Sequence, residues 1–233
     1  MQPSSPDQGV DEDITQLVTL KGRCSYVLLA LLSALFLYPA LVARTWGLVV
    51  MAMLVSTIVI SIAYAVGKSR RQLIAASLFA VALLILQWTY LASGDPLVFI
   101  IGVVMFSAFM GFAIAELFIY LMRRGPVTGD KLHAALAAYI LGALLWAGLY
   151  TLLEHLSPGS FLINTQRAAP PEFYDMLYFS FTTLTSTGYG DLTPATRWAE
   201  SLVILEQIAG VFYVAVLIAR LAGLYPPRAA GPE

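Results

Sequence analysis

Long apolar stretches alternate with short polar breaks along most of the chain. A helix that crosses a bilayer needs about 20 predominantly apolar residues, and runs of about that length recur. Five of them are Tyr26–Ala43, Gly47–Val66, Leu73–Ala92, Leu97–Met122 and Leu132–Leu156. A sixth, Trp198–Tyr225, is interrupted by Glu200, Glu206 and Arg220 but is apolar at both ends. We therefore predict an all-α membrane protein with six transmembrane helices.

The segment between the fifth and sixth runs, Ser157–Arg197, has a different character. It is rich in Pro, Gly, Ser and Thr, and its apolar part, Phe173–Leu184, is too short to cross a bilayer. We interpret this segment as a re-entrant loop that enters and leaves the membrane on one side.

The composition indicates that lipid is the main solvent of the protein. The 233 residues are 59% hydrophobic and only 12% charged, whereas a soluble domain carries roughly 25% charged residues. The net charge of -1 gives no overall imbalance that would attract nucleic acid. Cys24 is the single cysteine, which excludes an internal disulfide and a thiolate metal cluster.

The basic residues are divided unevenly between the two sides of the predicted spans. Cytoplasmic loops of membrane proteins carry an excess of Lys and Arg. With the N-terminus in the cytoplasm, 10 of the 13 Lys and Arg residues lie inside, and only Arg44, Arg167 and Arg197 lie outside. The inner set is Lys21, Arg23, Lys68, Arg70, Arg71, Arg123, Arg124, Lys131, Arg220 and Arg228. We predict a multi-pass protein of the cell membrane, with both termini in the cytoplasm and Ser157–Arg197 outside.

The most informative stretch runs from Tyr178 to Asp191 and reads Tyr-Phe-Ser-Phe-Thr-Thr-Leu-Thr-Ser-Thr-Gly-Tyr-Gly-Asp. It resembles the pore loop and selectivity filter of tetrameric potassium channels, which carry Thr-Val-Gly-Tyr-Gly. The core Gly188–Asp191 matches fully and lies between two predicted spans on the outer side. The resemblance covers roughly residues 132–225 and is to prokaryotic six-transmembrane channels of the voltage-gated-like superfamily.

The resemblance implies a potassium-selective, passively conducting channel subunit that assembles with three further copies of itself in membrane lipid. The ion sites would be formed by the carbonyl groups of Ser186, Thr187, Gly188 and Tyr189 with the Ser186 hydroxyl, and Gly190 would complete the filter. Potassium ions would occupy these sites, and no organic cofactor is expected.

The physics of a dehydrated cation agrees with this interpretation. Non-helical backbone at membrane depth is tolerated only where it lines a cavity, and a ring of carbonyl groups there replaces the water around an ion. Carbonyl groups all point to one axis only if successive residues alternate in handedness. Gly188 and Gly190 can adopt the unusual dihedrals without a Cβ penalty. We expect residues 171–184 to form the pore helix, with Pro171 at its first position and Glu172 and Asp175 at its positive end.

The filter departs from the family pattern at two positions, where Ser186 and Thr187 replace Thr and Val. Ser186 keeps the hydroxyl of the innermost site, while Thr187 places a hydroxyl behind the filter, for which Thr182 or Glu206 is the expected partner. We hypothesise that potassium selectivity survives and filter stability changes. Thr182 and Thr185 are predicted filter supports.

The aromatic cuff around the filter also departs from the family. Many relatives have two Trp residues where this chain has Tyr178 and Phe179. We predict that the Tyr178 hydroxyl holds Asp191; the alternative is that both rings are simply buried apolar bulk.

Two residues of the last span are candidates for a role in gating. Glu206 is an acid inside the membrane, which makes it a functional-site candidate. We hypothesise that it braces the filter from behind and makes the current sensitive to pH; the alternative is an acid satisfied by pore-helix hydroxyls. Gly210 lies where relatives place a hinge glycine, and close packing on a neighbouring helix is its alternative.

The break at Arg123–Lys131 contains Gly125, Pro126 and Gly129 and suggests a modular chain. We predict a cytoplasmic tail at 1–24, a four-helix module at 25–124, a pore domain at 130–225 and a short cytoplasmic tail at 226–233. The fourth span has no Lys or Arg between Leu97 and Met122, so this module lacks the arginine row of a voltage sensor. Strong voltage gating is not expected.

Other functions remain open at this point. A non-selective monovalent cation channel shares the architecture, and Thr187 keeps that alternative in view. A non-conducting regulatory subunit is a second alternative, against which the intact filter argues. An enzyme is not expected, because His133 and His155 lie at opposite ends of one predicted helix and cannot share a site.

Overall fold

The computed structural model describes residues 23–42, 47–66, 70–123, 128–164 and 170–222, most of them helical. The helices are α2 (Arg23–Val42), α3 (Gly47–Val66), α4 (Arg70–Ser93), α5 (Pro96–Met122), α6 (Gly129–Leu156), α7 (Phe173–Leu184) and α8 (Arg197–Ala222). Two short strands, β1 (Phe161–Ile163) and β2 (Leu192–Pro194), flank α7. The six long helices begin and end within a few residues of the predicted spans. Nearly all of the predicted N-terminal tail and all of the C-terminal tail lie outside the described residues.

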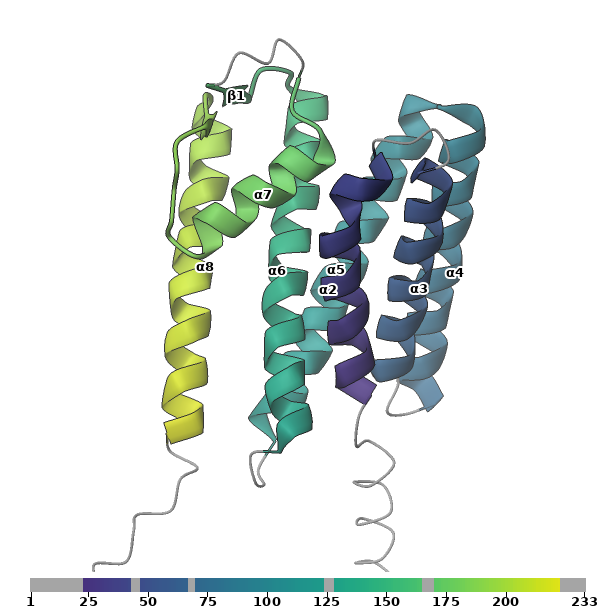
Figure 1. Ribbon diagram of the computed structural model, residues 1–233, viewed down its shortest axis with the longest axis vertical. Coiled ribbons are helices and arrows are strands. Elements are labelled where there is room, and N and C mark those ends of the chain that lie inside the picture. Colours follow the sequence, from purple (N-terminus) through teal and green to yellow (C-terminus); the bar gives the residue numbers. More distant parts are fainter. Residues whose placement is uncertain (1–22, 43–46, 67–69, 124–127, 165–169, 223–233) are drawn as a thin grey trace, which may run out of the picture.

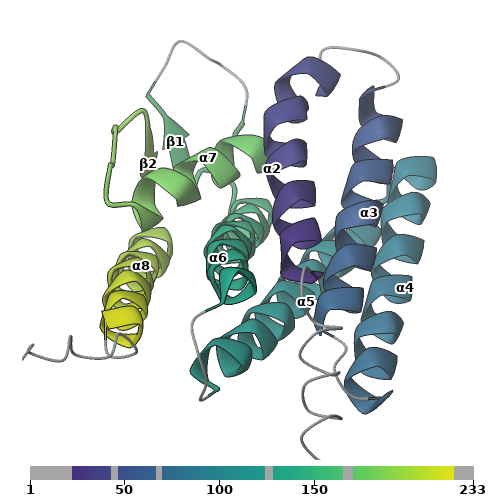
Figure 2. The same ribbon diagram turned by 60° about the horizontal axis from the view of Figure 1, so that its bottom comes forward.

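The long helices lie roughly side by side, and successive ones run in opposite directions (Figure 1). Helices α2 to α5 form a bundle on one side of α6, while α8 stands on the other side (Figures 1 and 2). The short helix α7 is inclined between α6 and α8 and occupies one end of the molecule, beside the two strands. The segment between α6 and α8 therefore folds back within one half of the helix length.

Four helices are long and apolar enough to cross a membrane, namely Arg70–Ser93, Pro96–Met122, Gly129–Leu156 and Arg197–Arg220. Within the described residues, α2 and α3 hold shorter apolar stretches, Cys24–Ala40 and Ala52–Tyr64. These helices support a multi-pass, all-α membrane protein. The count of six spans stays a prediction.

Two hydrophobic clusters hold the helices together, and α6 belongs to both. The first joins α2, α3, α4 and α5 to the first half of α6, where buried alanines let the neighbouring helices come close. The second joins the other half of α6 to α7, α8 and both strands. Gly148 marks a close approach of α6 to α5, because a Cβ atom there would lie 2.6 Å from the Ser107 Oγ. The bundle thus packs directly on the helix that supports α7.

Strands β1 and β2 form an antiparallel ribbon, in which Phe161 pairs with Pro194 and Ile163 with Leu192. Ser160, fully buried, extends the ribbon because its carbonyl accepts a hydrogen bond from the Ala195 amide at 2.8 Å. We did not predict this ribbon, since three residues are too few to show a strand's alternation of polar and apolar positions. It ties the end of α6 to the start of α8.

Helix α7 begins two residues later than expected. Its first residue is Phe173 and its N-cap is Glu172, so the prediction that Pro171 occupies the first helical position is wrong. The Glu172 amide donates to the Asp175 carboxylate at 2.9 Å. This bond forms one side of a capping box, which fixes the helix start without the proline.

At the opposite end of the molecule, polar contacts join helices that are distant in sequence. Asp130, in the first turn of α6, accepts from the Cys24 amide at 3.2 Å and from the Tyr120 hydroxyl at 3.0 Å. Arg220, near the end of α8, donates to the carbonyl groups of Met122 and Arg123 at the end of α5. A cation is favourable at this end of a helix, where the carbonyl groups carry partial negative charge.

Candidate functional site

The loop that follows α7 alternates in backbone handedness. Ser186, Gly188 and Gly190 have positive φ angles of 57°, 53° and 78°, whereas Thr187 and Tyr189 between them do not. The expectation for the two glycines is met. Ser186 was not foreseen, because a residue with a Cβ atom enters this region at a cost of roughly 1–2 kcal/mol. The alternation is the backbone condition for turning successive carbonyl groups to one side.

The loop is anchored on the C-terminal end of α7 by its own amide groups. The amides of Thr187 and Gly188 both donate to the Thr182 carbonyl, at 2.7 and 3.1 Å, and the Ser186 amide donates to the Thr183 carbonyl at 2.9 Å. These bonds satisfy helix carbonyl groups that otherwise lack a partner. Thr182 therefore supports the loop through its backbone, while its hydroxyl donates to the Phe179 carbonyl of its own helix.

The last carbonyl of α7 is enclosed by the two helices beside it. The Tyr139 hydroxyl of α6 donates to the Leu184 carbonyl oxygen at 3.2 Å. From the other side, Gly210 of α8 lies so close that a Cβ atom on it would come within 2.5 Å of the same oxygen. The geometry at Gly210 is that of close packing, the alternative to a hinge. A hinge at this position stays a prediction.

The hydroxyl of Thr187 has a different partner from the one we predicted. It lies 2.9 Å from the Thr185 hydroxyl, which also bonds the Phe181 carbonyl at 2.7 Å. The expectation that Thr182 or Glu206 supplies the partner is wrong, because both of those side chains are engaged elsewhere. Sequence proximity was the missed signal, since the two threonines are separated by one residue.

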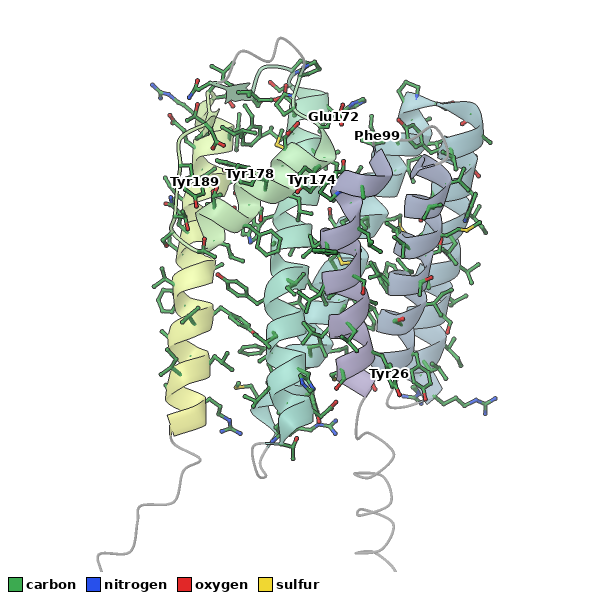
Figure 3. All side chains as sticks on the ribbon, in the orientation of Figure 1. Tyr26, Phe99, Glu172, Tyr174, Tyr178 and Tyr189 are labelled. Carbon is green, nitrogen blue, oxygen red and sulfur yellow. The ribbon has the colours of Figure 1, made fainter. Side chains whose placement is uncertain are left out.

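Tyr178 and Phe179 lie on different faces of α7, one exposed and the other buried. Tyr178 lies beside the loop, where its ring is parallel to that of Tyr189 at 6.4 Å between centroids (Figure 3). A hydrogen bond to Asp191 raises the pKa of the Tyr178 hydroxyl above its ordinary value, with some burial in the same direction. Phe179 is buried behind the helix, packed against Tyr150 and Phe161. The alternative interpretation, that both rings are simply buried apolar side chains, holds for Phe179 but not for Tyr178.

Asn164, just after β1, braces the outer end of the loop and was missed by sequence reasoning. Its side-chain amide donates to the Gly190 carbonyl at 2.9 Å and to the Thr193 hydroxyl at 3.3 Å. Its backbone amide donates to the Asp191 carbonyl at 2.7 Å. An Asn in a polar loop resembles many other turn residues, so only the ribbon that carries it reveals the contact.

Glu206 is fully buried at the junction of α6, α7 and α8. One carboxylate oxygen accepts from the Ser180 hydroxyl at 2.5 Å, and the other accepts from the Tyr150 hydroxyl. The Ser180 hydroxyl also lies 3.0 Å from the Ala143 carbonyl. Glu206 therefore joins three helices behind the loop. As expected, one of its partners is a hydroxyl of α7, that of Ser180. The expected bond between Glu206 and the Thr187 hydroxyl is not formed, because Thr187 bonds Thr185 instead.

The loop and one face of α8 remain uncovered in a single chain. Residues 185–190 are exposed, and the Tyr189 side chain is 70% exposed. Large apolar side chains on α8 are exposed as well: Ile204, Leu205, Ile208, Val211, Phe212, Val214, Val216 and Ile218. Many exposed large apolar side chains along one helix indicate contact with lipid or with another chain.

Glu154 and the two histidines have structural partners. Glu154 accepts from the Gly159 and Phe161 amides, His155 packs on the Phe99 ring, and His133 bonds the Ser25 hydroxyl at 2.7 Å. Within the described residues, no three His, Cys, Asp or Glu side chains gather in a way that holds a metal ion.

Comparison with known proteins places part of the chain in a functional class. Residues 138–225 match a family model described as Ion channel. The match begins within α6 and includes the ribbon, α7, the loop and α8. No solved structure matched the chain. The matched segment supports an ion channel, which is a transport protein and not an enzyme.

Proposed function

We propose that the chain is a subunit of a potassium-selective channel, in which four copies surround one central pore and conduct potassium passively across the cell membrane. The conducted ion is cargo, held in passing by the carbonyl groups of Ser186, Thr187, Gly188 and Tyr189. Gly190 completes this filter, and Tyr178, Thr182, Thr185 and Asp191 support it. No organic cofactor takes part.

The alternating backbone from Ser186 to Gly190 is the observation that carries this proposal. The amide groups of Thr187 and Gly188 are directed to the end of α7, which leaves carbonyl groups of the loop for an ion. A filter replaces the hydration shell of potassium with such oxygens. One loop supplies only one side of the ring, so several copies must meet at an axis.

The exposed apolar side chains of α8 also support assembly of several copies. Its apolar side chains from Ile204 to Ile218 lie on the helix that follows the loop, where neighbouring copies would cover them. A closed ring of identical subunits repeats one head-to-tail contact around its axis, so each copy contributes the same pair of surfaces. We propose four copies because the family that the loop resembles is tetrameric.

The division of basic residues supports the proposed orientation. Arg70, Lys131 and Arg220 lie at one end of the long helices, while the loop and the ribbon lie at the other. Basic residues mark the cytoplasmic side. We therefore propose six spans with both termini inside and the filter at the outer face.

A non-selective cation channel is the second candidate, and the Thr185–Thr187 hydroxyl pair favours it. Relatives have an apolar Val where Thr187 lies, so a polar contact replaces packing directly behind the filter. A loop held by a hydrogen bond between hydroxyls is free to exchange partners. A filter that relaxes in this way would lose its preference for potassium.

The reversal potential of the purified protein in a planar bilayer separates these functions. With potassium on one side and sodium on the other, we expect reversal close to the potassium equilibrium potential. Reversal near zero with robust current would select the non-selective channel. Absence of current across pH, voltage and lipid composition would favour the non-conducting regulatory subunit instead.

A further inference from the structure

An apolar cavity of about 430 Å³ lies among α3, α4 and α5, away from the loop. Leu144 of α6 and Phe173, the first residue of α7, complete its wall. Its volume falls in the range of about 300–1,000 Å³ that is typical of ligand pockets. Gly102, one of the wall residues, leaves room for a side chain, because a Cβ atom there would meet no atom within 4 Å.

The side chains that line the cavity are mostly apolar and favour a hydrocarbon ligand over water. Gln87 and Tyr90 are its only polar side chains among the described residues, and the Gln87 amide already donates to the Ala52 carbonyl at 2.8 Å. A buried water needs two to four polar partners, and a wall with two polar side chains among apolar ones offers few positions for it. Tyr90 and Leu91 are 41% and 38% exposed, so the cavity opens on the outer surface of the bundle.

Contacts at the far side of the cavity reach α7. The Phe106 and Phe173 rings, both in the wall, meet edge to face at 5.9 Å. The next residue of α7, Tyr174, stacks on Tyr38 of α2 at 4.1 Å. The start of the proposed pore helix is thus held by rings from the bundle.

We propose that this cavity holds one acyl chain of a phospholipid from the outer leaflet, and that the chain bears on Phe173 and so on the pore helix. This inference rests on the proposed membrane location and orientation. Because the cavity opens sideways between helices, its mouth then faces hydrocarbon, and Tyr90 is of the type that lies at the membrane interface. Lipid would thereby set the position of α7 and the open probability of the filter.

Native mass spectrometry of the purified channel tests the inference with two glycines of α5. Gly102→Leu adds a side chain at the cavity wall and reduces the free space, whereas Gly111→Leu adds the same side chain outside the wall; neither Cβ atom meets a neighbour within 4 Å. We expect wild type and Gly111→Leu to retain one more phospholipid per subunit than Gly102→Leu. Gly102→Ala, which perturbs the helix least, should show partial loss.

Potassium flux and open probability are measured on the same preparations. A changed open probability in Gly102→Leu but not in Gly111→Leu would support the coupling to α7. Equal lipid retention in Gly102→Leu and wild type would overturn the inference, as would a wild type without bound phospholipid. Absent potassium flux with this lipid pattern intact would refute the proposed function while leaving the lipid site standing.

Discussion

Ser186 is the residue at which the loop departs most from ordinary backbone geometry. Glycine adopts a positive φ freely, but serine does so only where its surroundings over-determine the conformation. The amides of Ser186, Thr187 and Gly188 are all held by α7, and this anchoring supplies the constraint. The Ser186 backbone is thereby fixed at the first turn of the loop, where the proposed innermost ion site lies.

Tyr178→Phe tests the outer support of the filter. The variant keeps the ring stacked on Tyr189 but removes the hydroxyl that bonds Asp191. We expect a several-fold faster decay of current during sustained opening, with an unchanged reversal potential. The hydrogen bond to Asp191 requires the protonated Tyr178 hydroxyl, and it raises the pKa of that hydroxyl above the ordinary value of about 10. The bond is therefore fully present below about pH 10. It is lost as the pH rises further, so alkaline pH should speed decay in wild type only.

Tyr174→Phe serves as the control for this change. Its hydroxyl is removed from the same helix, but the stacking on Tyr38 remains. Equal decay in wild type and Tyr178→Phe would show that the bond to Asp191 does not stabilise the filter.

Thr187→Val tests the hydroxyl pair behind the filter. The valine keeps the branched shape and loses the contact to Thr185 at 2.9 Å. We expect unchanged potassium selectivity and an altered open probability, measured in single-channel recordings. Because either substitution breaks the same contact, Thr185→Val combined with Thr187→Val should be non-additive. Additive effects, or a Thr187→Val channel identical to wild type, would speak against the pair.

At the scale of the elements, α7 is fixed between α6 and α8 by contacts to both helices. Tyr139 and Gly210 enclose its last carbonyl, and Glu206 joins its middle to both neighbours through Ser180 and Tyr150. Removing one partner of a buried polar contact leaves the other unsatisfied, at a cost of about 1–3 kcal/mol. These buried contacts therefore resist movement of α7 relative to α8.

Gly210→Ala separates close packing from a hinge. A Cβ atom 2.5 Å from the Leu184 carbonyl oxygen forces α7 and α8 apart, and such overpacking costs about 1–3 kcal/mol. We expect a lower thermal midpoint and a disturbed filter. In Gly142→Ala the added atom meets no neighbour within 4 Å, so this control should be neutral or stabilising. Unchanged stability in Gly210→Ala with slowed gating would favour the hinge.

Glu206→Gln tests the hypothesis that the current is sensitive to pH. Tyr139 and Tyr150, both on α6, are the titratable side chains that face the carboxylate. Glutamine keeps the size of the side chain and removes its ability to bind a proton. We expect the pH dependence of the wild-type current to flatten in this variant. An identical pH profile in both channels would leave Glu206 as a structural acid.

The sequence predicts elements better than contacts. Runs of apolar residues locate the six long helices, because length and hydropathy are local properties. The sequence does not predict the ribbon or the contacts of Asn164, because both depend on pairing between positions far apart in the chain. It also misses the start of α7, which depends on a few capping bonds. The Gly-Tyr-Gly core locates the loop, but only the folded chain shows that Thr185 partners Thr187 and that Gly210 packs on Leu184.

At the scale of the whole molecule, the bundle α2–α5 is joined to the proposed pore at both ends. Tyr38 stacks on Tyr174 at the end that holds α7, and Arg220 donates to the end of α5 at the other. Glu116, the acid within α5, accepts from Gln72 of α4 at 2.8 Å. This contact joins two neighbouring helices of the bundle.

The charge content of the bundle predicts how the channel responds to voltage. Moving one elementary charge through 100 mV yields about 2.3 kcal/mol, so steep gating needs several charges that cross the field. Helix α5 has no Lys or Arg, and Arg70 and Arg123 lie at helix ends. We expect open probability in symmetrical potassium to change by less than about twofold over 100 mV, because little charge is available to move. An e-fold change every few millivolts in single-channel recordings would require a sensor outside α5 and would contradict the charge argument.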